Sequence, residues 1–448
     1  MSRELATFLT LSFVIVSLYI DRGNDKKVSN AIWIVIIWLF YSVSIRGIYA
    51  IFEFGSRGIA LQDSYIDGHP ANKIILSMLI LAGLIVLIQR KVQFASLSGG
   101  NKALFFWYLY CAVSILWSDF PGVAIRRYIK GLGTVIMILI ILTENNRDEA
   151  FKMVFRKIMF VFVPVSILLI KYYPAIGKFY GAWGGEAIIA GLSDNKNSIG
   201  RICAICNFTV VWDFISQKKS QIANLTRPLY IFHIGLSLWL LRLSDSATSL
   251  IVLVVGLAIF FLMKLPAVRS RVKGIVIIGF ALLLLSAPLA NIFYSQLFGA
   301  AIDATGHADT FQSRIRLWND LLVTDSRPLI GYGFRSYWLG ERLSAIWSKY
   351  PILIPNQAHN GYLDVYLELG IIGLAILLLN TIVIFKRAIA SIAIGNEFGI
   401  VQLSLLIMVL LYNITESAFR PLHLMWFIFM VIAFEYTKRR LHPLIDSD

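Results

Sequence analysis

Residues 74–88 read IILSMLILAGLIVLI, an apolar run without a charged side chain. Such a run approaches the roughly 17–25 residues that a helix needs to cross the hydrocarbon core of a bilayer. Comparable runs recur along the chain, for example at 31–45, 274–289 and 370–385. Because these runs leave no soluble domain between them, the sequence predicts an all-α integral membrane protein with about 12–13 transmembrane helices.

The composition agrees with a membrane protein. Of 448 residues, 58% are hydrophobic and 15% are charged, and the mean hydropathy is +0.73. Soluble proteins have roughly 45–50% apolar and about 25% charged residues, so the excess of apolar side chains requires lipid as its solvent. The first run, 5–20, lacks a small-residue cleavage site and is followed by another membrane run, which predicts a retained helix instead of a signal peptide.

The formal net charge of +15 does not indicate nucleic-acid binding, because the basic residues form short clusters between apolar runs. Seven stretches assigned to the cytoplasm hold 22 Lys and Arg, whereas the six alternating stretches hold 17 over a longer total length, as the positive-inside rule requires. The cytoplasmic stretches are 21–30, 89–102, 144–157, 216–227, 264–274, 386–398 and 437–448, and the outer stretches are 46–73, 119–130, 171–197, 242–247, 298–360 and 414–421. Insertion does not require basic residues on the outer face, so these are candidate ligands for an anion.

The three cysteines predict no disulfide framework. Cys111, Cys203 and Cys206 all lie in apolar segments. Cys203 and Cys206 form a CxxC pattern, but its surroundings are those of an apolar helix and not of a redox loop, so we expect simple packing.

Residues 1–448 are expected to form a single polytopic membrane domain, because no internal repeat or long linker interrupts the chain. One segment differs from the rest. From 298 to 360 the chain is polar and contains Gly, Pro, Trp and six basic residues. Long connections of this kind are usually functional or disordered, and the aromatic residues and prolines argue against disorder.

Three motifs follow one another around this segment: SRIRLW at 313–318, RPLIGYG at 327–333 and AHNGYLDVYLELG at 358–370. Their order resembles that of the O-antigen ligase and polymerase family, which includes exopolysaccharide production proteins that polymerise lipid-linked repeat units. In that family an Arg, followed four residues later by Trp, precedes a Pro-Leu-x-Gly-x-Gly turn and then a His-Asn that opens the next helix.

The resemblance extends over roughly residues 110–430. Its further parts are LWSDFP at 116–121 with Arg126 and Arg127, DNKNSIG at 194–200, and NITES at 413–417. One position departs from the family, because LSDSATS at 243–249 has Ala247 where members usually carry a basic residue. Arg242, five residues upstream, is the candidate to replace it as a second diphosphate-binding cation.

The resemblance implies a GT-C-like membrane fold and an inverting, metal-independent glycosyltransferase without a cofactor. The donor would be an undecaprenyl-diphosphate-linked oligosaccharide at the periplasmic face of a bacterial inner membrane, with 298–360 as a periplasmic catalytic loop. The acceptor would be another repeat unit for a polymerase, which the motifs slightly favour, or lipid A core or another surface acceptor for a ligase. The implied partners are the bilayer and possible further polysaccharide assembly proteins, but no nucleic acid.

The chemistry of such a transfer indicates which residue types are needed. A sugar on a lipid diphosphate already carries its leaving group, so the protein must activate an acceptor hydroxyl and neutralise charge on the diphosphate. His359 is the candidate base, since an imidazole can take a proton at neutral pH. Arg314 is the candidate diphosphate ligand, since a guanidinium offers bidentate hydrogen bonds to phosphate oxygens. The outer stretches contain no Asp-x-Asp, Gly-rich phosphate loop or His/Cys cluster, which favours catalysis without a metal.

Asn360, Asp364 and Glu368 recur at every fourth residue and predict a polar stripe along a helix that enters the membrane. Carboxylates in such a place usually mark function, although a structural role for either one stays open. The other candidate substrate ligands are Arg242, Arg316, Trp318, Lys196, Asn197 and Glu416. Arg316 is a rival to Arg314, Trp318 could instead anchor the loop at the interface, and Lys196 with Asn197 could serve only loop hydrogen bonding.

A second class of function is a transporter or lipid-sugar flippase, which also has many helices. Such proteins commonly show repeated halves and broken helices in matching positions, and the sequence shows neither. A third class, a non-catalytic scaffold, would leave Asp364 and Glu368 without a reason to be there.

Overall fold

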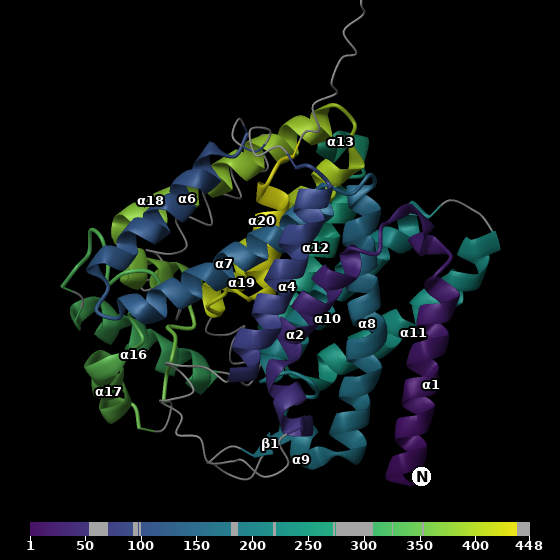
Figure 1. The fold of residues 1–448 in the computed structure, drawn as a ribbon, viewed down its shortest axis with the longest axis horizontal. Coiled ribbons are helices and arrows are strands. Elements are labelled where there is room, and N and C mark those ends of the chain that lie inside the picture. Colours follow the sequence, from purple (N-terminus) through teal and green to yellow (C-terminus); the bar gives the residue numbers. More distant parts are fainter. Residues whose placement is uncertain are drawn as a thin grey trace, which may run out of the picture.

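The computed structural model describes residues 1–52, 70–92, 97, 100–180, 187–217, 221–271, 274, 308–324, 326–351 and 354–436. These residues form a helical bundle (Figure 1), which confirms the all-α prediction. The helices are α1 (Arg3–Asp21), η1 (Asn24–Lys27), α2 (Ile32–Phe52), α4 (Pro70–Gln89), α6 (Lys102–Val113), η2 (Ser114–Trp117), α7 (Pro121–Leu142), α8 (Arg147–Tyr172), α9 (Pro174–Gly177), α10 (Lys196–Ser216), α11 (Gln221–Leu243), α12 (Ala247–Leu262), α13 (Pro266–Arg269), α16 (Ala308–Thr324), α17 (Gly340–Lys349), α18 (Gly361–Ala393), α19 (Glu397–Thr415) and α20 (Leu424–Ala433). Strands β1 (Lys178–Tyr180) and β2 (Ala187–Ile189) pair antiparallel, with Phe179 opposite Ile188.

Six helices of the described residues are long and apolar enough to cross a membrane, and four shorter apolar helices accompany them. The chain is therefore a multi-pass membrane protein. The total of about 12–13 spans stays a prediction, because 53–69, 275–307 and 437–448, which include most of the run 274–289, lie outside the described residues.

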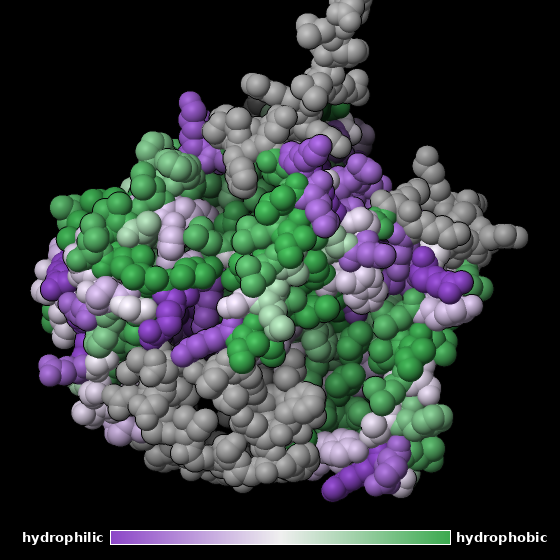
Figure 2. Space-filling model, viewed as in Figure 1, coloured by the Kyte–Doolittle hydropathy of each residue, from purple (hydrophilic) through white to green (hydrophobic). Residues whose placement is uncertain are grey.

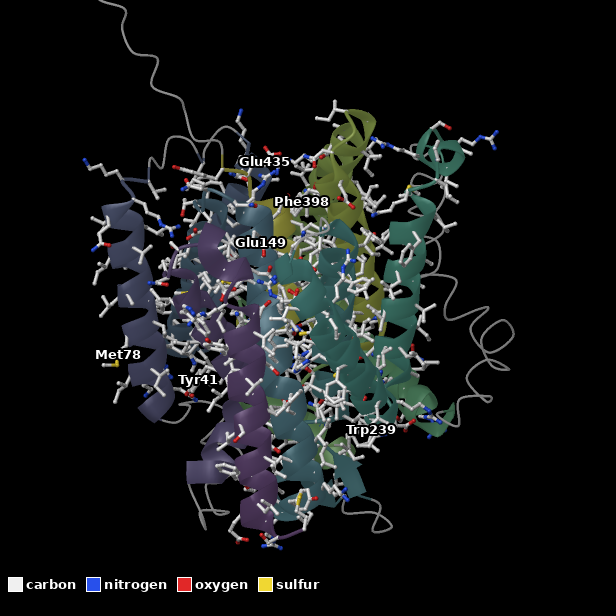
Figure 3. The ribbon with its side chains drawn as sticks, turned by 90° about the vertical axis from the view of Figure 1, so that its right-hand side faces the viewer. Tyr41, Met78, Glu149, Trp239, Phe398 and Glu435 are labelled. Atoms are coloured by element: carbon white, nitrogen blue, oxygen red, sulfur yellow. The ribbon has the colours of Figure 1, made fainter. Side chains whose placement is uncertain are left out.

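The helices divide into a buried centre and a lipid-facing periphery. The apolar windows of α8 and α10 are 83% buried, whereas those of α1 and α4 are only 22% and 17% buried. Phe8 on α1 and Met78 on α4 are largely exposed, and Figure 3 shows Met78 pointing away from the bundle. Figure 2 shows broad hydrophobic areas on one face. Exposed apolar surface of this extent fits contact with lipid.

One end of the bundle holds a buried ionic cluster. Arg156 on α8 is fully buried and donates to Asp21 of α1 (Nε to Oδ2, 2.7 Å) and to Asp213 of α10 (Nη1 to Oδ2, 2.7 Å). Lys157 contacts the same Asp21 oxygen at 2.8 Å, and the Tyr230 hydroxyl of α11 donates to its other oxygen. The prediction that 144–157 is a cytoplasmic loop was therefore wrong in part, because α8 begins at Arg147 and its charges are neutralised by carboxylates from other helices.

Ion pairs join segments that the charge pattern places on the same side of the membrane. Arg90 pairs with Glu144, Lys264 with Glu397 and Arg387 with Glu435, all between expected cytoplasmic ends. Figure 3 shows Glu149, Phe398 and Glu435 toward one end of the molecule and Trp239 toward the other. The alternation of ends thus agrees with the predicted topology, while the orientation in the membrane stays a prediction.

The described part of the polar segment 298–360 contains two helices, α16 and α17, which lie together at the lower left of Figure 1. A small apolar core holds them: Leu317 and Leu321 of α16, Leu343 of α17 and the connecting Tyr337 and Trp338 are all buried together. This segment is therefore a small folded layer, and its helices place motif residues in fixed positions.

Helix α18 is broken at Gly370, whose φ of 66° and ψ of −167° are non-helical. The turn 327–333 fits against the break: Ile371 N donates to Pro328 O at 2.8 Å, and Tyr332 N donates to Leu367 O at 3.1 Å. The Tyr110 hydroxyl donates to Leu369 O at 2.9 Å. The turn and Tyr110 thus satisfy backbone groups that a broken membrane helix would leave unpaired.

Candidate functional site

Helix α16 explains the spacing of the Arg-x-x-x-Trp motif. Residues four apart lie on the same face of a helix, so Arg314 and Trp318 point from the same side of α16. Arg314 donates from Nη1 to the Thr415 carbonyl at 2.5 Å and from Nη2 to Glu416 Oε1 at 3.0 Å. Trp318 donates from Nε1 to the Ala358 carbonyl at 2.6 Å. The motif therefore joins α16 both to the end of α19 and to the residue before His359.

Glu416, at the end of α19, is the centre of the site. Its side chain is buried, and its Oε1 also accepts from Asn197 Nδ2 at 2.7 Å. Its Oε2 lies 3.5 Å from His359 Nδ1. A single carboxylate thus contacts three side chains from three separate parts of the chain.

The electrostatics of the site keep Glu416 ionised. Burial raises the pKa of the Glu416 carboxyl, but the hydrogen bond and charge of His359 and the charges of Arg314 and Arg201 outweigh it. The net result is a pKa below the ordinary value. Glu416 is therefore a negative charge at neutral pH, surrounded by cationic groups.

Asn197 is held in place by two neighbouring elements. The Asn195 side chain caps α10 by accepting from Ser198 N at 2.8 Å, which puts Asn197 in the first turn. Ser246, which precedes α12, donates to Asn197 Oδ1 at 3.1 Å. With its oxygen engaged in this way, the amide nitrogen of Asn197 is oriented toward Glu416.

His359 has an unusual backbone that its neighbours hold on both sides. Its φ is +51°, a region that L-residues rarely adopt outside functional or over-determined sites. The preceding residue is fixed through Ala358 N, which donates to Asp364 Oδ1 at 3.0 Å. The following residue is fixed through Asn360 N, which donates to Ser417 Oγ at 3.1 Å. The His359 side chain is 34% exposed, so it remains accessible to a ligand.

The residues of the predicted polar stripe on α18 form their hydrogen bonds with other groups of the protein. Asn360 caps the helix and accepts from Tyr362 N and Leu363 N. Asp364 is buried, and its Oδ1 also accepts from Trp338 Nε1 at 2.9 Å. Glu368 is buried against Arg335, which donates from its backbone N at 3.0 Å and from Nη1 at 2.9 Å. These residues therefore fold the segment around His359.

Three predicted ligands lie outside this network. Arg242 and Arg316 are exposed, and Lys196 is partly exposed and lies 3.4 Å from Asp245 Oδ2. Their contact with a substrate stays a prediction. Among the described residues, no group of three or more His, Cys, Asp or Glu side chains is arranged to hold a metal ion.

Sequence reasoning missed several residues of the site. Arg201, four residues after Asn197 on α10, is buried near Glu416, and its Nε has no hydrogen-bond partner among the described residues. A charged residue inside an apolar helix was the signal that could have identified it. Gln357 Nε2 lies 3.3 Å from His359 Nδ1. Ser417 and Arg335 are the other missed supports.

The site combines the partly exposed imidazole of His359 with the guanidinium of Arg314, which is held by two hydrogen bonds. Arg314 uses Nη1 and Nη2 toward the protein, and a guanidinium carries five N–H donors, so it retains donors for an anion. The His359 side chain is 34% exposed, so a hydroxyl can approach it. Base and cation are joined through Glu416.

Two similarities to known proteins agree with this site. Residues 232–378 match the family model described as O-Antigen ligase. The chain is also 23% identical over 301 residues to the exopolysaccharide production protein ExoQ of Rhizobium meliloti (strain 1021), an alignment that covers 64% of this chain and 66% of that protein. The chain thus spans just under two thirds of that relative's length.

These matches confirm the family resemblance indicated by the motifs. The segment that matches the family model contains Arg314 and His359, whereas Asn197 lies before it and Glu416 after it. The described helices show an all-α membrane protein, and the two matches show that it is similar to O-antigen ligases and to an exopolysaccharide production protein.

Proposed function

We propose that this chain is a glycosyltransferase that moves an oligosaccharide from undecaprenyl diphosphate to a hydroxyl of another lipid-linked repeat unit. The observation that carries the proposal is the meeting of His359, Arg314 and Glu416, with 3.5 Å between Nδ1 and Oε2 and 3.0 Å between Nη2 and Oε1. The similarity to O-antigen ligases supports the reaction class.

In the proposed reaction, the acceptor oxygen attacks the anomeric carbon on the face opposite the diphosphate. The bond between that carbon and the diphosphate oxygen breaks, the diphosphate leaves with the electron pair, and the acceptor proton goes to His359 Nε2. Configuration is inverted because a single displacement occurs. Arg314 binds the diphosphate oxygens and offsets the charge that grows on them, and no metal is required in this scheme.

We place the reaction at the periplasmic face of a bacterial inner membrane, with 298–360 on that side. The basis is the lower density of Lys and Arg in the segments that surround the site. The expected partners are the bilayer, the lipid-linked glycan and other polysaccharide assembly proteins.

We favour polymerisation over ligation because the segments 116–121 and 194–200 resemble those of exopolysaccharide members of the family. A ligase would instead transfer the glycan to lipid A core or another surface acceptor. The break in α18 gives little support to a transporter, because the turn 327–333 and Tyr110 pair with backbone groups around Gly370. Offering purified protein a lipid-linked donor with either a second repeat unit or lipid A core distinguishes the two acceptors.

The role of the base is tested with defined lipid-linked donor and acceptor. His359→Ala should lose most product, since a general base typically contributes roughly 10²–10⁴-fold. His359→Gln should not restore it, because an amide cannot take the proton. Ser344→Ala, on exposed α17, is the control and should retain activity. Full activity of folded His359→Ala would refute the base assignment, and loss on chelation that added divalent metal reverses would refute the metal-free scheme.

A further inference from the structure

The two oxygens of Glu416 have different neighbours. Oε1 accepts from Arg314 Nη2 at 3.0 Å and from Asn197 Nδ2 at 2.7 Å, so these two donors fix the plane of the carboxylate. Oε2 lies 3.5 Å from His359 Nδ1. Because the carboxylate is held from one side by an arginine and an amide, its second oxygen is presented to the imidazole.

The Glu416 contact favours one imidazole nitrogen as the base. Nδ1 has a second neighbour, the Gln357 side-chain amide, whose Nε2 lies 3.3 Å away. Gln357 Oε1 has no hydrogen-bond partner among the described residues, and turning the amide over places this acceptor beside Nδ1. A carboxylate only accepts hydrogen bonds, so the tautomer that it favours carries its proton on Nδ1. The lone pair then lies on Nε2, at the opposite side of the partly exposed ring. A separation of 3.5 Å is long for a hydrogen bond, but such contacts often tighten only when substrate is bound.

The charged groups around the pair come from several elements. Arg314 of α16 and Arg201 of α10 face Glu416, and Tyr412 of α19 interacts with Arg201 and Glu416. Both arginines disfavour a positive charge on His359, whereas Glu416 favours it. Glu416 is the negative group contacted by His359, so its charge is the one that supports a protonated imidazole.

We infer that Glu416 is a positioning residue that orients His359 and stabilises its protonated form during transfer, so that the two act as a dyad. The inference rests on the proposed function. It replaces the predicted role of Glu416 as a substrate ligand, because its oxygens are directed to protein donors. Asn197 belongs to the same support, since it holds Oε1.

The test is the pH dependence of kcat and the donor KM of purified enzyme with defined lipid-linked donor and acceptor. Glu416→Gln keeps the shape of the side chain but removes its charge. We expect kcat to fall by about 100-fold or more, in line with the loss of an orienting carboxylate beside a catalytic histidine. The acidic limb of the kcat profile should move to lower pH, because the charge that stabilises the protonated base is then lost.

Glu416→Asp provides the second variant, and it keeps the test decisive if Glu416→Gln does not fold. The shorter carboxylate should lower kcat but leave the acidic limb near its wild-type position, since the charge remains. Glu435→Gln is the matched control, because Glu435 also pairs with an arginine, Arg387, but lies among the expected cytoplasmic ends. It should keep the wild-type profile.

The outcomes separate this inference from the proposed function. A lower kcat in Glu416→Gln with an unmoved acidic limb overturns the dyad and leaves His359 as the base. If only the donor KM changes, Glu416 acts through Arg314 in donor binding and not through His359. This result also overturns the dyad. Full activity of His359→Ala instead removes the proposed function itself.

Discussion

Replacing Gly370 by Ala should destabilise the protein, because the break in α18 requires glycine. The position has φ 66° and ψ −167°, a region essentially restricted to glycine, and occupying it with another residue costs of order 1–3 kcal/mol. An added Cβ would lie 2.2 Å from the Leu329 carbonyl oxygen and 2.3 Å from its carbon, both backbone atoms. Overpacking typically adds about 1–3 kcal/mol, so we expect a total loss of about 2–6 kcal/mol.

The assay is thermal unfolding in detergent with intrinsic tryptophan fluorescence. Unfolding entropy of about 2.1 cal/mol/K per residue, applied to the 448 residues, converts this loss into a Tm decrease of about 2–6 °C. Gly235→Ala in α11 is the control, since a Cβ there meets nothing within 4 Å, and alanine in a helix is favoured by up to about 1 kcal/mol. An unchanged or higher Tm for Gly370→Ala would refute the reasoning.

Four further changes follow from the contacts. Arg314→Lys keeps the charge but loses the planar fork, so transfer should fall by about 10-fold or more with normal membrane insertion; wild-type turnover in both Arg314→Lys and Arg314→Ala would remove its role. Trp318→Phe deletes the bond to the Ala358 carbonyl and should lower kcat by roughly 2- to 13-fold, as expected for one hydrogen bond of about 0.5–1.5 kcal/mol, without changing donor KM. Arg156→Met removes the buried guanidinium that Asp21 and Asp213 share and leaves Asp21 with Lys157 as its cation; it should cost about 3–5 kcal/mol of stability, measured as a lower Tm. Ser344→Cys should react with an impermeant thiol reagent in cells with an intact inner membrane, since the natural cysteines are buried; labelling only after lysis would overturn the outer orientation.

The sequence was sufficient for features that depend on spacing along one helix. The four-residue spacing of Arg314 and Trp318 predicts a shared face, and both side chains contact the region around His359. The stripe of Asp364 and Glu368 was predicted, and both residues are buried on α18. Helix periodicity alone gives such relations, because 3.6 residues per turn put neighbours of this spacing side by side.

Relations between distant segments could not be predicted in this way. Glu416 contacts His359 across 57 positions of sequence and Asn197 across 219, so its central place depends on how α10, α16 and α19 pack. The same reason explains the error at Arg156, whose partners come from separate helices and allow it to be buried instead of lying in a loop. A charge pattern alone does not distinguish a lysine or arginine in a cytoplasmic loop, which sets the membrane topology, from one that is buried in an ion pair.

The ionic clusters around Arg156 and around Glu416 show what distinguishes structural pairing from a reactive site. Arg156 is fully buried, and carboxylates from α1 and α10 contact its guanidinium, so a ligand would have to displace a protein partner. Arg314 and His359 have side chains that are 16% and 34% exposed, and they share Glu416, whose side chain is only 8% exposed. The buried carboxylate fixes both groups while their outer atoms remain accessible to an anion and a hydroxyl. We therefore expect catalysis where charged side chains are held by a buried partner on one side and remain open to a ligand on their exposed side.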